Sequence, residues 1–278
     1  MKLLISADME GISGIVDWDQ TRPGHPEYLS RGRRLMTGDV NAAINGAFEG
    51  GVDEVVVSDG HWDGDNILIE ELDPRARLNS GSPSPFAMLQ SIDDKPAPDA
   101  VMLVGYHALG GTGKGVLDHT WSDARIRSVW LNDVLVGEIG LNAALAAEYG
   151  APVIAFTGDQ HAGAEAQDLL GADLEIAVVK NATGRFAAQC LPLAESRERI
   201  CEAAARGVIK FREGRAARPY TVSAPVRLAV DFVATQHVDR ACLMPGAERL
   251  NGTRLEYTAP DMTTAHRAFR ALVLLARD

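Results

Sequence analysis

The sequence has few cysteines, no long apolar run and fewer basic than acidic residues. Its three cysteines, Cys190, Cys201 and Cys242, are widely spaced and form no Cys-x-x-Cys motif, so we expect them to stay reduced in a cytoplasmic protein. No apolar stretch approaches the length of a membrane span, and the N-terminus enters a strand pattern without the features of a secretory signal. These absences favour a cytoplasmic protein with no membrane partner.

The charge balance excludes a further class of partner. The 278 residues include 27 Lys and Arg against 38 Asp and Glu, which gives a formal net charge of −11. Nucleic-acid binding depends on clustered positive charge, so we expect no nucleic-acid partner. Apolar residues make up 46% of the chain, as in a folded globular protein with a substantial core.

Several common catalytic and binding motifs are also absent. There is no Gly-x-Ser-x-Gly elbow, and no cysteine lies in a nucleophile motif. The glycine-rich stretch 110–115 resembles a phosphate loop, but Ala108 occupies the first glycine position and Gly115 replaces the Ser or Thr. Residues 59–70 resemble a calcium loop, yet His61 occupies its third position. We therefore expect neither a phosphate loop nor a calcium site.

Apolar runs of strand length alternate with amphipathic helical patterns through the first two-thirds of the chain. The expected strands cover residues 3–7, 54–58, 100–105, 126–131, 153–157 and 174–179, and the expected helices cover 31–49, 138–149 and 162–169. This alternation predicts βαβ units and an α/β fold, with a largely parallel sheet flanked by helices.

The pattern changes after about residue 185. A long helix is expected at 193–211, followed by strands at 224–234 and 252–258 and a closing helix at 261–276. We therefore predict an α/β domain over residues 1–185 and a smaller C-terminal α+β lobe over residues 186–278. Because no long linker separates them, the two parts are expected to pack closely.

Carboxylates and imidazoles follow the ends of several expected strands. Asp8 and Glu10 follow the first strand, Asp59 and His61 follow the second, and His107 comes after the strand at 100–105. Ligands of open α/β sheets bind beyond the carboxyl ends of the strands, so we expect these side chains to meet at one edge. Two like charges at positions i and i+2 of an extended segment are costly unless a cation compensates them.

Glu138 begins an expected helix and can reach the same edge. Together with the residues above, it completes a set of oxygen and nitrogen ligands that suits zinc, manganese or cobalt. Two imidazoles and three carboxylates exceed what one tetrahedral zinc requires, whereas two ions sharing a carboxylate would use them all and activate water. Asp8, deepest at its strand end, is the natural bridge. Taken singly, each acidic residue is more often a solvated carboxylate or a helix cap than a ligand, and a lone histidine is more often structural than catalytic.

Three other polar residues leave alternatives open. Asp159 and His161 also follow a strand and are the strongest rival ligands. His119 lies in a glycine-rich loop and could act as an acid or base beside a metal, as a further ligand, or as an ordinary loop residue. Spacing alone does not choose among these roles.

Five ordered segments resemble the dinuclear-zinc D-aminopeptidase family. They are ADMEGISG at the start, SDGH at 58–61, GYHA at 105–108, DHT around His119 and NDVLVGEIGLNA at 132–143, with a similar LMPG at 243–246. The resemblance covers nearly the whole chain. It implies that Asp8, Glu10, His61, His107 and Glu138 are zinc ligands, with Asp8 bridging, and that His119 is catalytic. It also implies a homodecameric ring whose lumen encloses the active sites.

We therefore expect an enzyme with two Zn²⁺ per chain, or Mn²⁺ or Co²⁺ in their place, that removes the N-terminal residue of short D-amino-acid peptides. One alternative is an aminopeptidase or amidase of L or mixed stereospecificity on the same scaffold. Alternatives from other classes are a non-catalytic peptide-binding protein and a metal phosphoesterase. The phosphoesterase is weakened by the absence of a clear basic cluster for phosphate.

Overall fold

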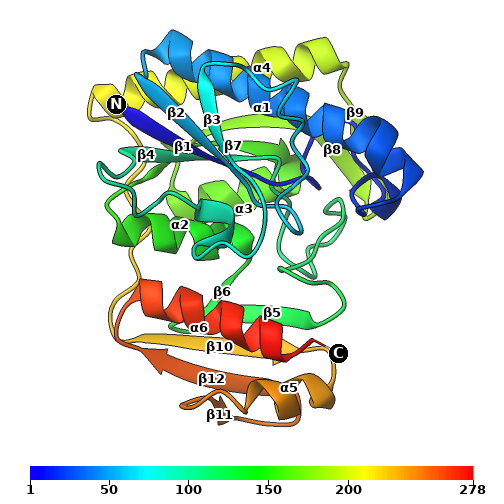
Figure 1. The fold of residues 1–278 in the computed structure, drawn as a ribbon, viewed down its shortest axis with the longest axis vertical. Coiled ribbons are helices and arrows are strands. Elements are labelled where there is room, and N and C mark those ends of the chain that lie inside the picture. The colour runs from blue at the N-terminus through cyan, green and yellow to red at the C-terminus, as the bar shows by residue number, and fades with distance from the viewer. Residues whose placement is uncertain (278) are drawn as a thin grey trace.

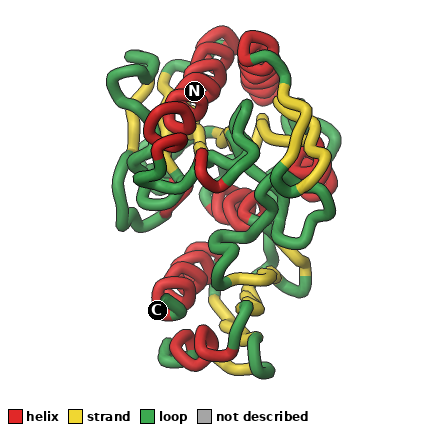
Figure 2. The backbone as a smooth tube through the Cα atoms, turned by 90° about the vertical axis from the view of Figure 1, so that its right-hand side faces the viewer, coloured by secondary structure: helices red, strands yellow, loops and turns green. Residues whose placement is uncertain are grey.

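The computed structural model describes residues 1–277 and contains two β-sheets, one above the other (Figures 1 and 2). In spatial order, sheet A has the strands β3 (Ala76–Asn79), β2 (Glu54–Asp59), β1 (Lys2–Ala7), β4 (Ala100–Val104), β7 (Val153–Asp159), β8 (Glu175–Gly184) and β9 (Ala187–Cys190). Sheet B has the strands β11 (Glu248–Arg249), β12 (Arg254–Ala259), β10 (Val226–Phe232), β5 (Ile126–Leu131) and β6 (Val134–Val136). In sheet A all neighbouring strands are parallel except the antiparallel pair β8–β9, whereas sheet B is antiparallel. This arrangement confirms the predicted α/β class.

The α-helices are α1 (Arg33–Gly50), α2 (Glu138–Glu148), α3 (Gln160–Leu170), α4 (Leu193–Arg212), α5 (Thr235–Ala241) and α6 (Met262–Leu275). All the strands and helices expected from the sequence are present, with ends shifted by a few residues. Helix α5 and the strands β3, β6, β9 and β11 were not expected, because elements this short show no clear periodicity. Within the described part of the chain, none of the helices combines the length with the hydropathy that a bilayer span requires.

Alternating side chains along β1 enter two separate cores. Leu3 and Ile5 pack with residues of α1 and α4 on one face, whereas Leu4 packs with residues of α2 and α3 on the other. Helices therefore cover both faces of sheet A, which explains why its central strands are apolar throughout. A third core lies between sheet B and the helices α5 and α6, and α2 contributes Leu141 and Ala144 to it. Helix α2 thus lies between the two sheets (Figure 1).

The predicted boundary near residue 185 does not separate the two sheets. Strands β5 and β6 precede that residue but pair with β10 in sheet B, and α4 follows it but packs against α1 and β8. Burial along β5 partly alternates, as in a strand with one solvated face, whereas the neighbouring strands of sheet A are continuously buried. The small layer therefore also contains residues 126–136.

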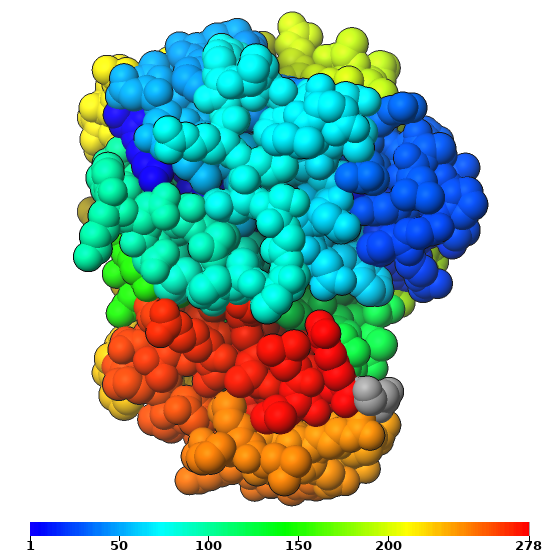
Figure 3. Space-filling view, viewed as in Figure 1, coloured from blue at the N-terminus to red at the C-terminus, as the bar shows by residue number. Residues whose placement is uncertain are grey.

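The order of sheet A reverses at β1. The chain moves outward from β1 to β2 and β3, then returns to β4 on the other side of β1 and continues to β7 and β8. Such a reversal opens a crevice beyond the carboxyl ends of the two central strands, where ligands of open α/β sheets bind. Below this crevice, α6 (red) meets the segment before β4 (cyan), and the Arg270 guanidinium donates to the Ser84 carbonyl there (Figure 3).

Helices α1 and α4 pack so closely that one glycine has no room for a side chain. A Cβ atom on Gly46 would lie 2.0 Å from the carbonyl oxygen of Cys201, a backbone atom. We expect Gly46→Ala to lower the free energy of unfolding by about 1–3 kcal/mol in denaturant titrations, because overpacking outweighs the gain in helix propensity. The matched control is Gly163→Ala in α3, whose Cβ would meet only side-chain methyl groups, the nearest at 3.2 Å. Equal effects of the two substitutions would contradict this account.

Candidate metal centre

The five side chains expected to bind metal converge at the crevice beside β1 and β4. Asp8 and Glu10 lie on the loop after β1, His61 follows β2, His107 follows β4, and Glu138 is the first residue of α2. Each has an exposed fraction of 5% or less. Three carboxylates and two imidazoles from four separate segments are therefore buried together, which we call the metal cluster.

Two groups of three side chains make up the cluster once His119 is included. The possible ligand atoms of Asp8, Glu10 and His61 lie within 4.8 Å of one another, and so do those of His107, His119 and Glu138. Asp8 connects the groups, because its Oδ1 lies 3.3 Å from His61 Nδ1 and its Oδ2 lies 3.4 Å from His107 Nε2. Glu10 Oε2 lies 3.2 Å from His61 Nδ1, and Glu138 Oε1 lies 3.2 Å from His107 Nε2.

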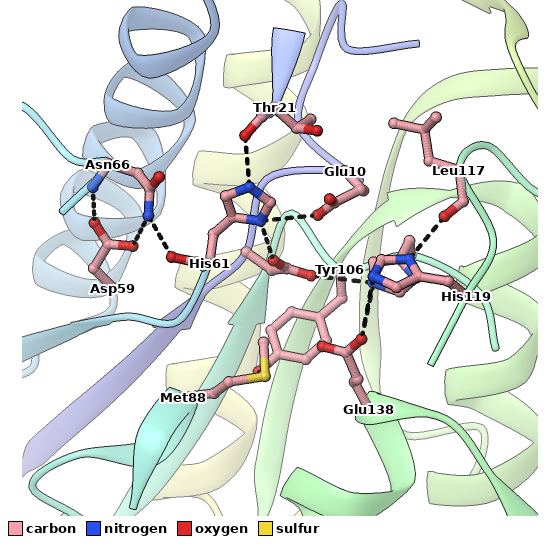
Figure 4. A network of polar contacts seen from close by, with 12 residues as sticks. Glu10, Thr21, Asp59, His61, Asn66, Met88, Tyr106, Leu117, His119 and Glu138 are labelled. Atoms are coloured by element: carbon pink, nitrogen blue, oxygen red, sulfur yellow. Dashed lines mark hydrogen bonds and ion pairs between the residues drawn. The ribbon is translucent and has the colours of Figure 1, made fainter. Parts of the chain in front are cut away.

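Backbone carbonyls orient all three imidazoles. His61 Nε2 lies 2.9 Å from the carbonyl oxygen of Thr21 (Figure 4). His107 and His119 each direct Nδ1 to a carbonyl within their own loop, at 3.0 Å and 2.9 Å. Because a carbonyl only accepts hydrogen bonds, the nitrogen that faces it carries the proton, and in the neutral ring the other nitrogen presents its lone pair to the cluster.

Several buried atoms of the cluster have no hydrogen-bond partner among residues 1–277. They are Asp8 Oδ2, Glu10 Oε2 and His107 Nε2. Buried polar atoms are normally satisfied, so a group of acceptors that face one another without donors suits a cation. Carboxylate oxygen and imidazole nitrogen are ligands that zinc accepts, and the residues therefore fit this metal.

The electrostatics of the cluster also favour positive charge. Burial and the adjacent Glu10 carboxylate raise the pKa of Asp8 to about 7. Burial lowers the pKa of His107, but the carboxylates of Glu138 and Asp8 outweigh this effect and raise it to about 10. The pKa of His61 lies well above its ordinary value for the same reason, chiefly through Glu10. Mutual repulsion of the carboxylates is thus relieved wherever a positive charge is available.

Two glycines allow the loops after β1 and β4 to lie against each other. A Cβ atom on Gly11 would lie 2.0 Å from the carbonyl oxygen of Tyr106, and one on Gly105, where φ is +74°, would lie 2.3 Å from that of Asp8. The backbone N–H groups of Asp8 and Gly11 donate to the carbonyls of Val104 and Gly105, at 2.8 Å and 2.7 Å. The side-by-side loops place Asp8 next to the segment that carries His107.

A buried lysine fixes the loop after β1. Lys180 on β8 is fully buried, and its Nζ donates to the carbonyls of Glu10, Ile12 and Ile15 at 2.6, 2.9 and 2.6 Å. An ammonium group has three N–H donors, so these contacts use its full capacity. Burial lowers the pKa of Lys180 to about 8. Lys180 was not expected from the sequence, although a lysine directly after the apolar run IAVV is an unusual feature.

His119 approaches the cluster from the loop between β4 and β5. Its ring stacks on that of His107, with centroids 4.1 Å apart and planes at 12°, and Trp18 contacts it edge-on at 5.4 Å. Its Nε2 lies 3.8 Å from Glu138 Oε1. Burial and the neighbouring His107 lower the pKa of His119, so its ring is neutral at pH 7. A neutral ring with Nε2 directed at the cluster can take up a proton or bind a metal.

The rival ligands have other partners. Asp159 caps helix α3, where its Oδ1 accepts from the backbone N–H groups of His161 and Ala162. Its Oδ2 accepts from the backbone N–H of Val116 at 2.9 Å. Among the described residues, neither Asp159 nor His161 belongs to a cluster that could hold a metal.

Asp59, which was expected at the same edge, instead supports the loop that carries His61. Its carboxylate accepts from the backbone N–H and the side-chain amide of Asn66, at 2.7 and 2.8 Å (Figure 4). It also accepts from the backbone N–H of Ile67 at 2.8 Å. The same amide donates to the carbonyl of His61 at 2.6 Å. Asp59 therefore positions a member of the cluster without joining it.

The metal cluster opens into a cavity of about 920 Å³. Loops of sheet A contribute Trp18 and Trp62 to its walls, whereas Trp121 and residues of α6 contribute from the other layer. A cavity of this volume accommodates a short peptide. A buried set of carboxylates and imidazoles at the ends of central strands, open to such a cavity, defines the class of metal-dependent hydrolases.

Comparisons with known proteins identify the family. The family model Peptidase M55, described as D-aminopeptidase, matches residues 1–271. The D-aminopeptidase of Bacillus subtilis (strain 168) is 36% identical over 277 residues, which are 99% of this chain and 98% of the relative. A solved structure, the Zn-dependent D-aminopeptidase DppA from Bacillus subtilis, a self-compartmentalizing protease, matches with a TM-score of 0.93 and 36% identity, over 99% of this chain and 98% of the other.

The chain belongs to the M55 family of D-aminopeptidases. The family predicted from the sequence motifs is confirmed, and with it the enzyme class, the peptide hydrolases.

Lys180 offers a test of how the loop after β1 is held. Lys180→Met keeps the apolar stem but leaves three buried carbonyls without a donor, so we expect it to lower the free energy of unfolding by about 1–3 kcal/mol. The control is Lys210→Met, which removes a partly exposed ion pair with Glu175 and is expected to cost less than about 1 kcal/mol. Chemical denaturation measures both. Equal losses would mean that the buried ammonium does not hold the loop.

Proposed function

We propose that the chain removes the N-terminal residue of short peptides that contain D-amino acids, using two zinc ions. Their ligands would be Asp8, Glu10, His61, His107 and Glu138. The observation that carries the proposal is the position of Asp8, whose two carboxylate oxygens each face a different imidazole. Asp8 would bridge the two ions, with Glu10 and His61 completing one site and His107 and Glu138 the other. The zinc dependence of the Bacillus subtilis relative supports this assignment.

Zinc in this cluster would ionise water at neutral pH and polarise the scissile carbonyl. The chain itself supplies the proton transfer, for which His119 is suitably placed. The hydrogen bond of its Nδ1 to the Leu117 carbonyl leaves Nε2 as the basic nitrogen and fixes its direction (Figure 4). His119 would accept a proton at Nε2 as the nucleophile forms and return it to the leaving amine. Its lowered pKa keeps it in the proton-accepting form at neutral pH.

We also propose that the chain forms a homodecameric ring in the cytoplasm. The Bacillus subtilis relative is a self-compartmentalizing protease, and a ring would enclose active sites in the same way. The isolated chain exposes large apolar side chains, among them Leu243 with an exposed fraction of 74%, which suits burial between subunits. Its three cysteines are free, as in proteins of a reducing compartment.

Metal analysis and stereochemistry test the proposed activity together. We expect two zinc ions per chain by elemental analysis, and faster hydrolysis of D-alanyl-D-alanine than of L-alanyl-L-alanine. Chelation should abolish turnover, and added Zn²⁺ should restore it. Asp8→Asn should bring the zinc content below two and reduce kcat/KM at least about 100-fold. Full activity with fewer than two ions would contradict the dinuclear site, and preference for the L-peptide would favour the alternative stereospecificity.

His119→Gln separates proton transfer from metal binding. If His119 moves a proton, kcat should fall by about 10²- to 10⁴-fold while KM and the zinc content stay near their wild-type values. His161→Gln is the matched control, since His161 lies outside the cluster, and it should leave all three quantities unchanged. Loss of zinc from His119→Gln would instead assign this residue as a further ligand.

A further inference from the structure

The wall of the cavity contains arginines as well as the acidic metal cluster. The arginines are Arg22, Arg125, Arg270 and Arg277. Three carboxylates outside the cluster also line the cavity, namely Asp59, Asp63 and Asp123. Asp59 is engaged by Asn66 and Ile67, and the remaining two, Asp63 and Asp123, are exposed. A substrate in this cavity therefore meets both a strongly acidic and a basic region.

Arg270 is a partly buried arginine that lines the cavity. It lies on α6, and its Nη1 donates to the carbonyl of Ser84. Among residues 1–277 its polar contact is this neutral carbonyl, and burial lowers its pKa with no carboxylate acting against this effect. A guanidinium has five N–H donors, so most remain available to a ligand. A partly desolvated guanidinium that meets no carboxylate among residues 1–277 favours an anionic ligand.

Trp121 connects this part of α6 to the metal cluster. Its backbone N–H donates to Glu138 Oε1 at 2.7 Å, and its indole stands edge-on to Phe269, the neighbour of Arg270, with centroids 5.1 Å apart. Its φ of +62° is rare for a bulky residue, so the surrounding contacts hold it in place. Trp121 thus contacts both the cluster and α6, and Arg270 lines the same cavity as the cluster.

The geometry points to Arg270 as the residue that binds the α-carboxylate of a short peptide whose scissile bond lies at the metal cluster. The inference rests on the proposed peptidase function and specifies its substrate class, peptides of two or three residues with a free C-terminus. A planar guanidinium pairs with a carboxylate through two parallel hydrogen bonds. A C-terminal amide, or a chain that continues past this point, offers no anion to Arg270.

A pair of substrates that differ only at the C-terminus tests this assignment. The zinc-loaded enzyme is assayed with D-alanyl-D-alanine and with its C-terminal amide. We expect kcat/KM to be about 10- to 100-fold higher for the free acid, mainly through a lower KM. A wild-type enzyme that hydrolyses the acid and the amide equally well would overturn the inference.

Substitutions at Arg270 test whether this residue causes the preference for the free acid over the amide. In Arg270→Gln, the acid-to-amide ratio of kcat/KM should fall to near one, through a higher KM for the acid, while the zinc content stays at the wild-type value. Arg270→Lys keeps the charge but loses the paired hydrogen bonds, so its ratio should be intermediate. The matched control is Arg267→Gln, one turn earlier on α6, where the exposed guanidinium lies over Phe86; its ratio should match the wild type.

Two further outcomes are informative. Equal loss of activity on the acid and the amide in Arg270→Gln would mean that Arg270 only supports the fold, and the inference would be wrong. If the wild-type enzyme hydrolyses neither compound, the proposed peptidase function fails. The same dipeptide then serves as a stable ligand in calorimetry with the zinc-loaded protein. A roughly tenfold or greater loss of its affinity in Arg270→Gln would support the carboxylate site, and unchanged affinity would overturn it.

Discussion

Repulsion among the buried carboxylates of Asp8, Glu10 and Glu138 is the constraint on which the rest of the site depends. Each has an exposed fraction of 5% or less, so water screens their charges poorly. Affinity for cations depends on keeping these groups close, and their own charges drive them apart. The glycine contact between the loops after β1 and β4, and the position of α2 between the two sheets, both oppose that separation.

The contacts that hold the site are made largely to the main chain. Lys180 donates to three carbonyls, the imidazoles of His61, His107 and His119 each donate to one, and Asp59 accepts from two backbone N–H groups. The positions of the cluster side chains therefore depend on the path of the backbone more than on the side chains next to them. Residues between them can vary as long as that path is kept, which is consistent with a closely similar fold at 36% identity in the relative.

The sequence allowed prediction of what depends on local pattern. Apolar runs located the strands, and because these polar residues follow strand ends, the convergence of Asp8, His61 and His107 was foreseeable. Contacts between segments far apart in the sequence could not be predicted in this way. Lys180 reaches a loop some 170 residues earlier in the chain, and β5 belongs to sheet B only through pairing with β10. Asp59 has the same sequence context as the residues of the cluster, and only the fold of its own loop determines that its carboxylate accepts hydrogen bonds from Asn66 and Ile67 instead.

The assignment of β5 to sheet B also has a consequence for the newly made chain. Leu131 pairs with Leu228, so β5 has no place in sheet B until β10 has been synthesised. Domains fold as they emerge, N-terminal parts first. The residues of the cluster all lie within the first 138 positions and so precede in synthesis the helix α6, which lines the cavity. The pocket that receives a substrate is therefore the last part of the site to be completed.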